Sequence, residues 1–145
     1  MASIAPPPQG LYLPAKRHGD LIFVSGMTPR QEGVLMFTGK VDAASDMDRL
    51  RAATELATQN SLSAARAQLE PGEALAGPIS LTVYVNADPS YTAHSKVADF
   101  ASAHLAGQFE GDIPSRAAIG VASLPGDAPV EISAIFSVGP SAPRS

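Results

Sequence analysis

Arg116 and Glu131 stand near the C-terminus in two otherwise apolar, strand-like stretches separated by a Leu-Pro-Gly-Asp turn. A guanidinium presents a planar fork of donors that suits a carboxylate. A carboxylate nearby can orient or deprotonate a water molecule. The pair therefore predicts a pocket for a small acid. The simpler alternative is an exposed ion pair on an ordinary hairpin, because such pairs are common and contribute little to stability.

Side-chain alternation predicts which face of a sheet each of the two residues occupies. In a strand over residues 130–138, Glu131 lies on the face opposite the most apolar side chains. In a strand over residues 116–122, Arg116 lies on the face opposite Ile119 and Val121. If the more apolar faces pack under helices, Arg116 and Glu131 both project from the helix-free side.

The spacing of Arg116 and Glu131 does not decide whether their side chains meet within one subunit or across two. A simple hairpin turning near Pro125 and Gly126 would place Arg116 opposite Ile135, about four residues or ~13 Å along the strand from Glu131. The two side chains could therefore meet within one subunit. Alternatively, Arg116 of one chain faces Glu131 of the next.

Hydrophobic periodicity and turn signals predict the elements that position these residues. The predicted strands cover residues 11–17, 21–25, 34–37, 79–86, 116–122 and 130–138. One helix begins at a capping box of Ser45 and Asp48 and ends before Pro71. A second is capped by the Asp-Pro-Ser sequence at 88–90 and runs to about Phe109. This order predicts an α+β domain with a mixed sheet and both helices on one face.

The helix-free face of such a sheet is predicted to need a cover. Ile135, together with the small residues Ala118 and Gly120, makes that face too apolar and too smooth for full solvation. A second copy of the chain is the expected cover, which predicts a homo-oligomer.

Length and composition describe one globular domain. The chain has 145 residues, of which 45% are hydrophobic, and a core over about residues 11–138 lies between a Pro-rich N-terminal tail and a C-terminal tail. It has no cysteine, which excludes disulfides, thiolate nucleophiles and zinc–thiolate sites. Its three histidines have no metal-ligand spacing, so a metal is not expected. No cofactor is expected either, because an arginine and a glutamate that holds a water suffice for the hydrolysis of a small imine.

Charge and hydropathy limit the kinds of partner that are expected for this protein. The net charge is −4 and no stripe of Lys and Arg is present, so nucleic acid is not an expected ligand. No stretch approaches the roughly 18 apolar residues of a membrane span, and the N-terminus lacks a basic start followed by an apolar run. A cytoplasmic protein without membrane contact is therefore expected.

The residues around Arg116 and Glu131 also resemble a known family. Residues 114–119 with 130–132, and residues 21–29 with their Ser-Gly loop, resemble the signature of the RidA/YjgF family, also called the L-PSP endoribonuclease-like family. The resemblance covers about residues 11–138. It implies a chorismate-mutase-like fold, a homotrimer whose sheets form a central barrel, and ligand clefts between subunits.

The resemblance also implies an activity. Family members that act as enamine/imine deaminases hydrolyse reactive 2-aminoacrylate-type intermediates to 2-oxo acids and ammonia. By resemblance, Arg116 binds the substrate carboxylate, Glu131 positions the water, and Tyr12 lies in the cleft. Ser25 and Gly26 form the Ser-Gly loop of the ligand site.

Several residues depart from the family pattern. Ala117 and Ala118 replace a small polar residue and a frequent cysteine, Met27 replaces a glutamine, and Asp99 stands where an asparagine is usual. A carboxylate at position 99 would repel an anionic substrate, so the substrate is expected to differ. Two alternatives follow. One is a non-catalytic binding protein for a small carboxylate, and the other, disfavoured by the acidic charge, is an endoribonuclease or translation inhibitor.

Overall fold

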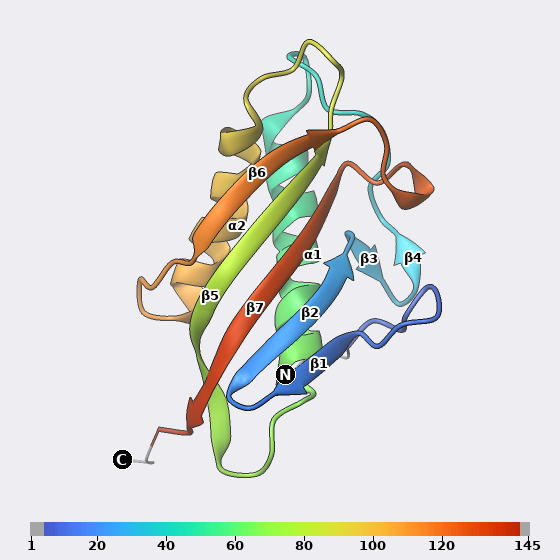
Figure 1. The fold of residues 1–145 in the computed structure, drawn as a ribbon. Coiled ribbons are helices and arrows are strands. Elements are labelled where there is room, and N and C mark those ends of the chain that lie inside the picture. Colours follow the sequence, from blue (N-terminus) through green and yellow to red (C-terminus); the bar gives the residue numbers. More distant parts are fainter. Residues whose placement is uncertain (1–4, 143–145) are drawn as a thin grey trace.

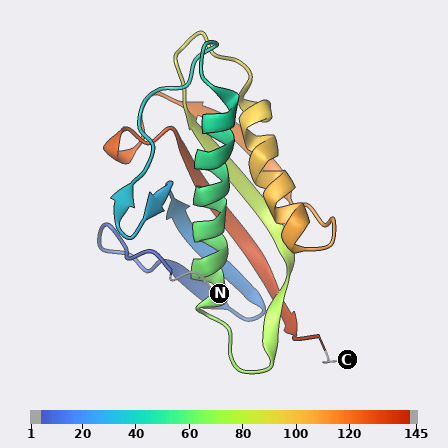
Figure 2. The same ribbon diagram turned by 180° about the vertical axis from the view of Figure 1, so that it is seen from behind.

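The computed structural model describes residues 5–142 and shows a main sheet with two helices packed on one of its faces (Figures 1 and 2). The strands are β1 (Ala15–His18), β2 (Leu21–Met27), β3 (Arg30–Gln31), β4 (Val34–Leu35), β5 (Glu73–Asn86), β6 (Ser115–Val121) and β7 (Val130–Pro140). The helices are α1 (Met47–Arg66) and α2 (His94–Gln108), and one 3-10 turn, η1, covers Pro125–Asp127. The predicted α+β architecture is confirmed.

The main sheet has five strands in the order β1-β2-β7-β5-β6. β5 and β6 are parallel, whereas every other pair in this sheet is antiparallel. The hairpin predicted between the last two strands is therefore wrong, because β5 lies between β6 and β7. Helix α2 makes the crossover that a parallel pair requires.

Helix α1 begins at a cap one residue later than the sequence predicts. The Asp46 carboxylate accepts a hydrogen bond from the Asp48 N–H at 2.9 Å. Ser45 instead belongs to the preceding turn, where its hydroxyl accepts from the Asp42 N–H. The helix ends at Arg66, ahead of Pro71 as expected.

Helix α2 begins at His94, several residues after the predicted cap. The Asp88 carboxylate accepts bonds from both the backbone and the hydroxyl of Ser90, and the Tyr91 N–H binds the Asp88 carbonyl. These bonds close a separate turn, which is why the 88–90 signal does not start the helix. Ala93 occupies the cap position without a side-chain bond.

The strands also differ in length from the prediction. β5 begins at Glu73 rather than 79 and passes two register shifts against β7. β1 begins only at Ala15. The short strand at Val34–Leu35 does not join the main sheet, because it pairs with Arg30–Gln31 in a separate two-stranded sheet.

The core lies between the helices and the sheet. Its largest fully buried side chains include Phe136, Ile22, Leu62, Leu81 and Leu105. None of the helices within residues 5–142 is long and apolar enough to cross a membrane.

The helix-free face carries exposed apolar side chains, as predicted, although Ile119 was expected on the opposite face of its strand. Leu21 is 37% exposed and Phe23 and Ile119 are 43% exposed. Ala118 and Gly120, however, belong to the helix side of β6. Ala118 packs against the core, and a Cβ on Gly120 would collide with the His94 ring of α2.

Candidate functional site

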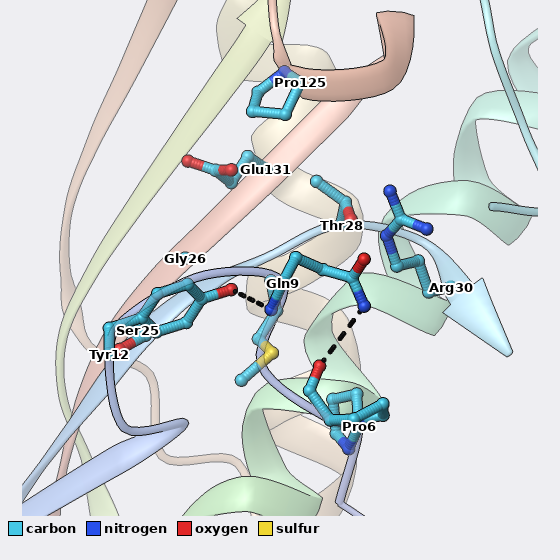
Figure 3. A pocket seen from close by; sticks show the side chains of 11 residues that line it. Pro6, Gln9, Tyr12, Ser25, Gly26, Thr28, Arg30, Pro125 and Glu131 are labelled. Atoms are coloured by element: carbon cyan, nitrogen blue, oxygen red, sulfur yellow. Dashed lines mark hydrogen bonds between the residues drawn. The ribbon is translucent and has the colours of Figure 1, made fainter. Parts of the chain in front are cut away.

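A cavity of about 420 Å³ opens between the N-terminal segment, the end of β2 and the start of β7 (Figure 3). Four residues of the predicted ligand site line it, namely Tyr12, Ser25, Gly26 and Glu131. Pro6 and Pro7 also line it, so this part of the expected N-terminal tail lies against the cavity. The first four residues of that tail, and residues 143–145 of the other, lie outside the described chain.

Glu131 is the acid of this cavity. It lies on β7 between the buried residues Val130 and Ile132, so its side chain projects from the helix-free face. Burial raises the pKa of its carboxyl above the ordinary value. Within residues 5–142, no side-chain hydrogen bond or ion pair engages this carboxylate. Glu131 is therefore available to a ligand or a water molecule.

Gly26 makes room for Glu131. A Cβ placed on Gly26 would lie 2.7 Å from Oε2 and 2.8 Å from Cδ of Glu131. Real Cβ atoms do not approach other atoms this closely, so only glycine allows the carboxylate its observed place. The Ser-Gly loop thus positions the acid from the neighbouring strand.

The hydroxyls of Tyr12 and Ser25 hold the N-terminal segment at the cavity. The Tyr12 hydroxyl accepts a hydrogen bond from the Gln9 N–H at 3.0 Å (Figure 3). The Ser25 hydroxyl donates to the Leu13 carbonyl at 2.6 Å. Both residues therefore line the cavity and also hold the N-terminal segment beside it.

Arg30 is a cavity residue that the sequence interpretation missed. It begins β3, and one terminal nitrogen of its guanidinium donates to the Gly33 carbonyl at 3.1 Å. Its position directly after the Ser-Gly loop and Pro29 was the available signal. In the view of Figure 3, Thr28 separates the side chains of Arg30 and Glu131.

Arg116 lies on the other face of the sheet, which corrects the expectation that it shares a surface with Glu131. In the parallel register it pairs with Leu81, a residue buried under the helices. Its guanidinium binds three side chains of α2: Asp99 at 2.7 Å, Ser102 at 3.0 Å and Ser95 at 2.8 Å. Within one subunit, Arg116 ties the edge strand β6 to α2.

Asp99 has a role that the sequence interpretation did not foresee. It was expected to stand in the ligand site and repel an anion, but its carboxylate forms the ion pair with Arg116. Ala118 lies on the same face of β6. The predicted site residues therefore fall into two groups on opposite faces: Arg116, Asp99 and Ala118 beside α2, and Tyr12, Ser25, Gly26 and Glu131 around the cavity.

The other ionisable residues of the described chain form no metal site. Within the described chain, no group of three or more His, Asp and Glu residues could hold a metal ion. His104 lies between the helices, where its Nε2 is 3.0 Å from Oε1 of Gln59 and burial lowers its pKa. His104 is therefore a packed helix residue.

Comparison with known proteins identifies the family of this chain. The family model described as Endoribonuclease L-PSP matches residues 3–138. The chain belongs to the RidA/YjgF, or L-PSP, family. The Trypanosoma cruzi protein TCP17 is 30% identical over 122 residues, which cover 83% of this chain and 76% of that protein.

Solved structures of this family share the fold. Protein Atu1372 of Agrobacterium tumefaciens, whose function is unknown, is 32% identical with a TM-score of 0.78, covering 89% of this chain and 82% of that one. The YjgF gene product of E. coli is 25% identical with a TM-score of 0.61, covering 94% and 93%. The RidA/YjgF assignment inferred from residues 114–119 and 130–132 is confirmed.

Proposed function

We propose that this member of the RidA/YjgF family hydrolyses reactive 2-imino and 2-enamino acids to 2-oxo acids and ammonia at the cavity around Glu131. The observation that carries the proposal is a half-buried carboxylate of raised pKa, unpaired among the described residues, in a cavity large enough for a small metabolite. The reaction class is the one implied by the resemblance to family members that act as enamine/imine deaminases.

Glu131 would handle the protons of this reaction. Water adds to the imine carbon, forming a C–O bond, and Glu131 takes the proton that this water loses. The same carboxyl returns the proton to nitrogen, which gives a carbinolamine. Glu131 then carries the remaining hydroxyl proton to nitrogen, the C=O bond forms as the C–N bond breaks, and ammonia leaves. An enamine first gains a proton on carbon to become the imine. A raised pKa suits both steps, because proton transfer is most efficient when the pKa of the group approaches the working pH.

The carboxylate of the substrate requires a cation. Arg116 keeps the role that the resemblance implies only if a second copy of the chain carries it to the cavity, because in its own subunit it lies across the sheet. The homotrimer implied by the resemblance is part of this proposal. The exposed Leu21, Phe23 and Ile119 give the helix-free face an apolar surface that such an assembly would cover.

The experiment is an imine hydrolysis assay with a matched pair of variants. An amino-acid oxidase generates imino acids in situ, and imine loss is followed with wild type, Glu131→Gln and Glu110→Gln. Glu110 is an exposed glutamate outside the cavity, so its variant controls for the change of charge. We expect wild type to accelerate imine loss and Glu131→Gln to lower kcat by about 100-fold or more, with binding retained.

Two results would contradict this function. If Glu131→Gln hydrolyses imines as fast as wild type, the carboxylate has no part in proton transfer. If wild type binds a 2-oxo acid but never accelerates imine loss, the cavity belongs to a binding protein for small carboxylates.

A further inference from the structure

Asn86 is a fully buried amide at the end of β5. Its Nδ2 donates to Oδ1 of Asp127 and to the Ala128 carbonyl, both at 3.0 Å. Its Oδ1 accepts from Nζ of Lys40 at 2.9 Å. Both ends of the amide are bound, and this fixes its orientation, because a flipped amide would turn its NH2 group toward the ammonium group.

The amide of Asn86 connects a cation to an anion. The Lys40 ammonium group binds the carbonyl end of the amide, and the Asp127 carboxylate binds the NH2 end. Hydrogen bonds that run in one direction between opposite charges polarise and strengthen one another. Lys40 also donates to the Ala122 carbonyl, directly after β6. The Lys40–Asn86–Asp127 network therefore joins the segment before α1, the ends of β5 and β6, and η1.

The turn η1 has a strained backbone that its neighbours hold in place. Gly126 and Asp127 both have positive φ, 66° and 61°. This region is uncommon for residues with a side chain, and aspartate is one of the few that tolerate it. The Asp127 carbonyl accepts from the Gly39 N–H at 2.8 Å. The Asn86 N–H donates to the Pro129 carbonyl at 2.9 Å. Bonds from β5 and from the segment before α1 therefore support the turn in addition to its own hydrogen bonds.

η1 also forms part of the wall beside Glu131. Pro125 lines the cavity together with Glu131, and in the view of Figure 3 Glu131 lies between Pro125 and Gly26. Ala128 and Val130, which lie between η1 and Glu131 in the chain, are fully buried. A shift of η1 would therefore move Pro125 and open that side of the carboxyl to water.

The pKa of the Glu131 carboxyl reports how well it is shielded from solvent. Burial, and no neighbouring charge, accounts for the raised pKa of this carboxyl. The other ionisable side chains nearby are Tyr12 and Arg30, which line the cavity, and Tyr84 of β5, which pairs with Glu131 of β7. If these groups stay in place, a change that exposes the carboxyl to water will lower its pKa toward the ordinary value.

We infer that Asn86 is a positioning residue for Glu131, acting through Asp127 and η1, and that Lys40 anchors the amide of Asn86 in the orientation that this role requires. Held in this way, Pro125 keeps water from one side of the Glu131 carboxyl. The inference rests on the proposed function for the reaction that Glu131 serves. The shielding of the carboxyl depends only on the network.

The test measures the pKa of the Glu131 carboxyl directly, by carbon NMR titration of isotope-labelled protein without a ligand. Asp127→Gly removes the partner of Asn86 but accepts the positive φ. Asp127→Asn removes the charge but keeps an acceptor for Asn86 and a residue that suits the turn. We expect the pKa of Glu131 to fall toward its ordinary value in Asp127→Gly and to stay near that of wild type in Asp127→Asn.

Lys40→Met tests the cation, and the sign of its effect separates two explanations. If Lys40 acted on Glu131 only through its charge, removing it would raise the pKa of the carboxyl. Loss of the anchor instead exposes the carboxyl and lowers that pKa. We expect a fall in Lys40→Met and none in Lys96→Met, which removes an exposed lysine of α2 outside the cavity. Lys40 is itself exposed, so its variant should fold even if Asp127→Gly does not.

The same variants are then assayed for imine loss. Asp127→Gly should lower kcat by about 10-fold with little change in KM, because a small displacement of a positioned group impairs proton transfer more than binding. The acid limb of kcat/KM against pH should move to lower pH as the pKa of the base falls. A merely structural role of the network would leave this limb where it is in wild type.

Several results would overturn the inference. It fails if the Glu131 carboxyl of wild type titrates at its ordinary value, or if folded Asp127→Gly leaves the pKa of Glu131 unchanged. It also fails if Asp127→Asn lowers that pKa as much as Asp127→Gly does, or if Lys40→Met raises it or leaves it unchanged. Thermal unfolding shows whether each variant is folded.

The titration separates this inference from the proposed function. If the pKa of Glu131 responds as expected but wild type never hydrolyses imines, the positioning of the carboxyl stands and the hydrolase does not. If folded Asp127→Gly hydrolyses imines with the kcat of wild type and an unchanged pKa of Glu131, the hydrolase stands and the positioning role does not.

Discussion

Replacing Gly26 by alanine should disable the cavity without unfolding the protein. The new Cβ would lie 2.7 Å from Oε2 and 2.8 Å from Cδ of Glu131. Carbon atoms in good contact are about 3.5 Å apart, so the carboxylate must move by roughly 0.8 Å. The crowded atoms are the end of a flexible side chain, so the side chain can move while the strand stays in place.

The magnitude follows from two separate effects. A displacement of about 1 Å in a positioned catalytic group costs on the order of 100-fold in rate, so Gly26→Ala should lower kcat nearly as much as Glu131→Gln. An off-rotamer glutamate costs about 0.5 to 1.5 kcal/mol. The reduced freedom of the unfolded chain returns about 0.4 to 1 kcal/mol. The free energy of unfolding should therefore change by less than about 1 kcal/mol.

The assay measures kcat for imine loss and the unfolding midpoint of the same samples. Gly107→Ala is the matched control, because a Cβ on Gly107 meets no heavy atom within 4 Å. That variant should keep wild-type kcat. Full activity in a folded Gly26→Ala protein, beside an inactive Glu131→Gln protein, would show that the observed place of the carboxylate is not the one used in catalysis.

Three further predictions concern the fold that carries the site. Asp46→Ala should lower the free energy of unfolding by about 1 kcal/mol in denaturant titrations, because α1 loses its cap. Hydrogen bonding to Arg17 lowers the pKa of Glu73 to about 2, so this pair should stabilise the fold above about pH 4.5 and lose its effect as pH falls toward 2. Glu73→Gln should remove that dependence in unfolding midpoints measured against pH. Asn86→Ala should cost about 1 to 3 kcal/mol by calorimetry, because this buried amide binds Asp127 of η1.

Periodicity and local turn chemistry predicted most of the elements. Alternation located β2, β6 and β7 within a few residues, since each has one face that is buried in the core or packed against it. The cap of α2 was misplaced because an Asp-Pro-Ser sequence can close a turn as readily as it can start a helix. Asp88 makes the turn, and the helix follows at His94.

The cavity was only partly predictable. Glu131 was chosen for the chemistry of its side chain, and Tyr12, Ser25 and Gly26 were found from the resemblance. The four residues line one cavity. Arg30 was missed because the direction of its side chain depends on a two-residue turn and on Asn60, which is 30 positions away in the sequence. Nothing in the sequence of the Ser-Gly loop indicates that Asn60 of α1 binds the backbone carbonyls of Thr28 and Arg30.

The placement of Arg116 shows what strand alternation leaves undetermined. Alternation states which residues of a strand share a face, but the pairing register decides which face that is. The helical segment between β5 and β6 favoured a parallel crossover over a hairpin. In the observed parallel register Arg116 lies beside Leu81, which faces the helices, whereas Glu131 pairs with Tyr84 on the other face.

The polarity of β6 is a second reason why Arg116 was wrongly assigned to the helix-free face. Arg116, Ala118 and Gly120 form the less apolar set, and such a set normally faces solvent. β6 is an edge strand, however, and the side of α2 that reaches Arg116 carries Ser95, Asp99 and Ser102. A polar strand residue therefore finds partners under the helix. Within one subunit, the ion pair that fixes this edge engages the same arginine that the resemblance assigns to the ligand.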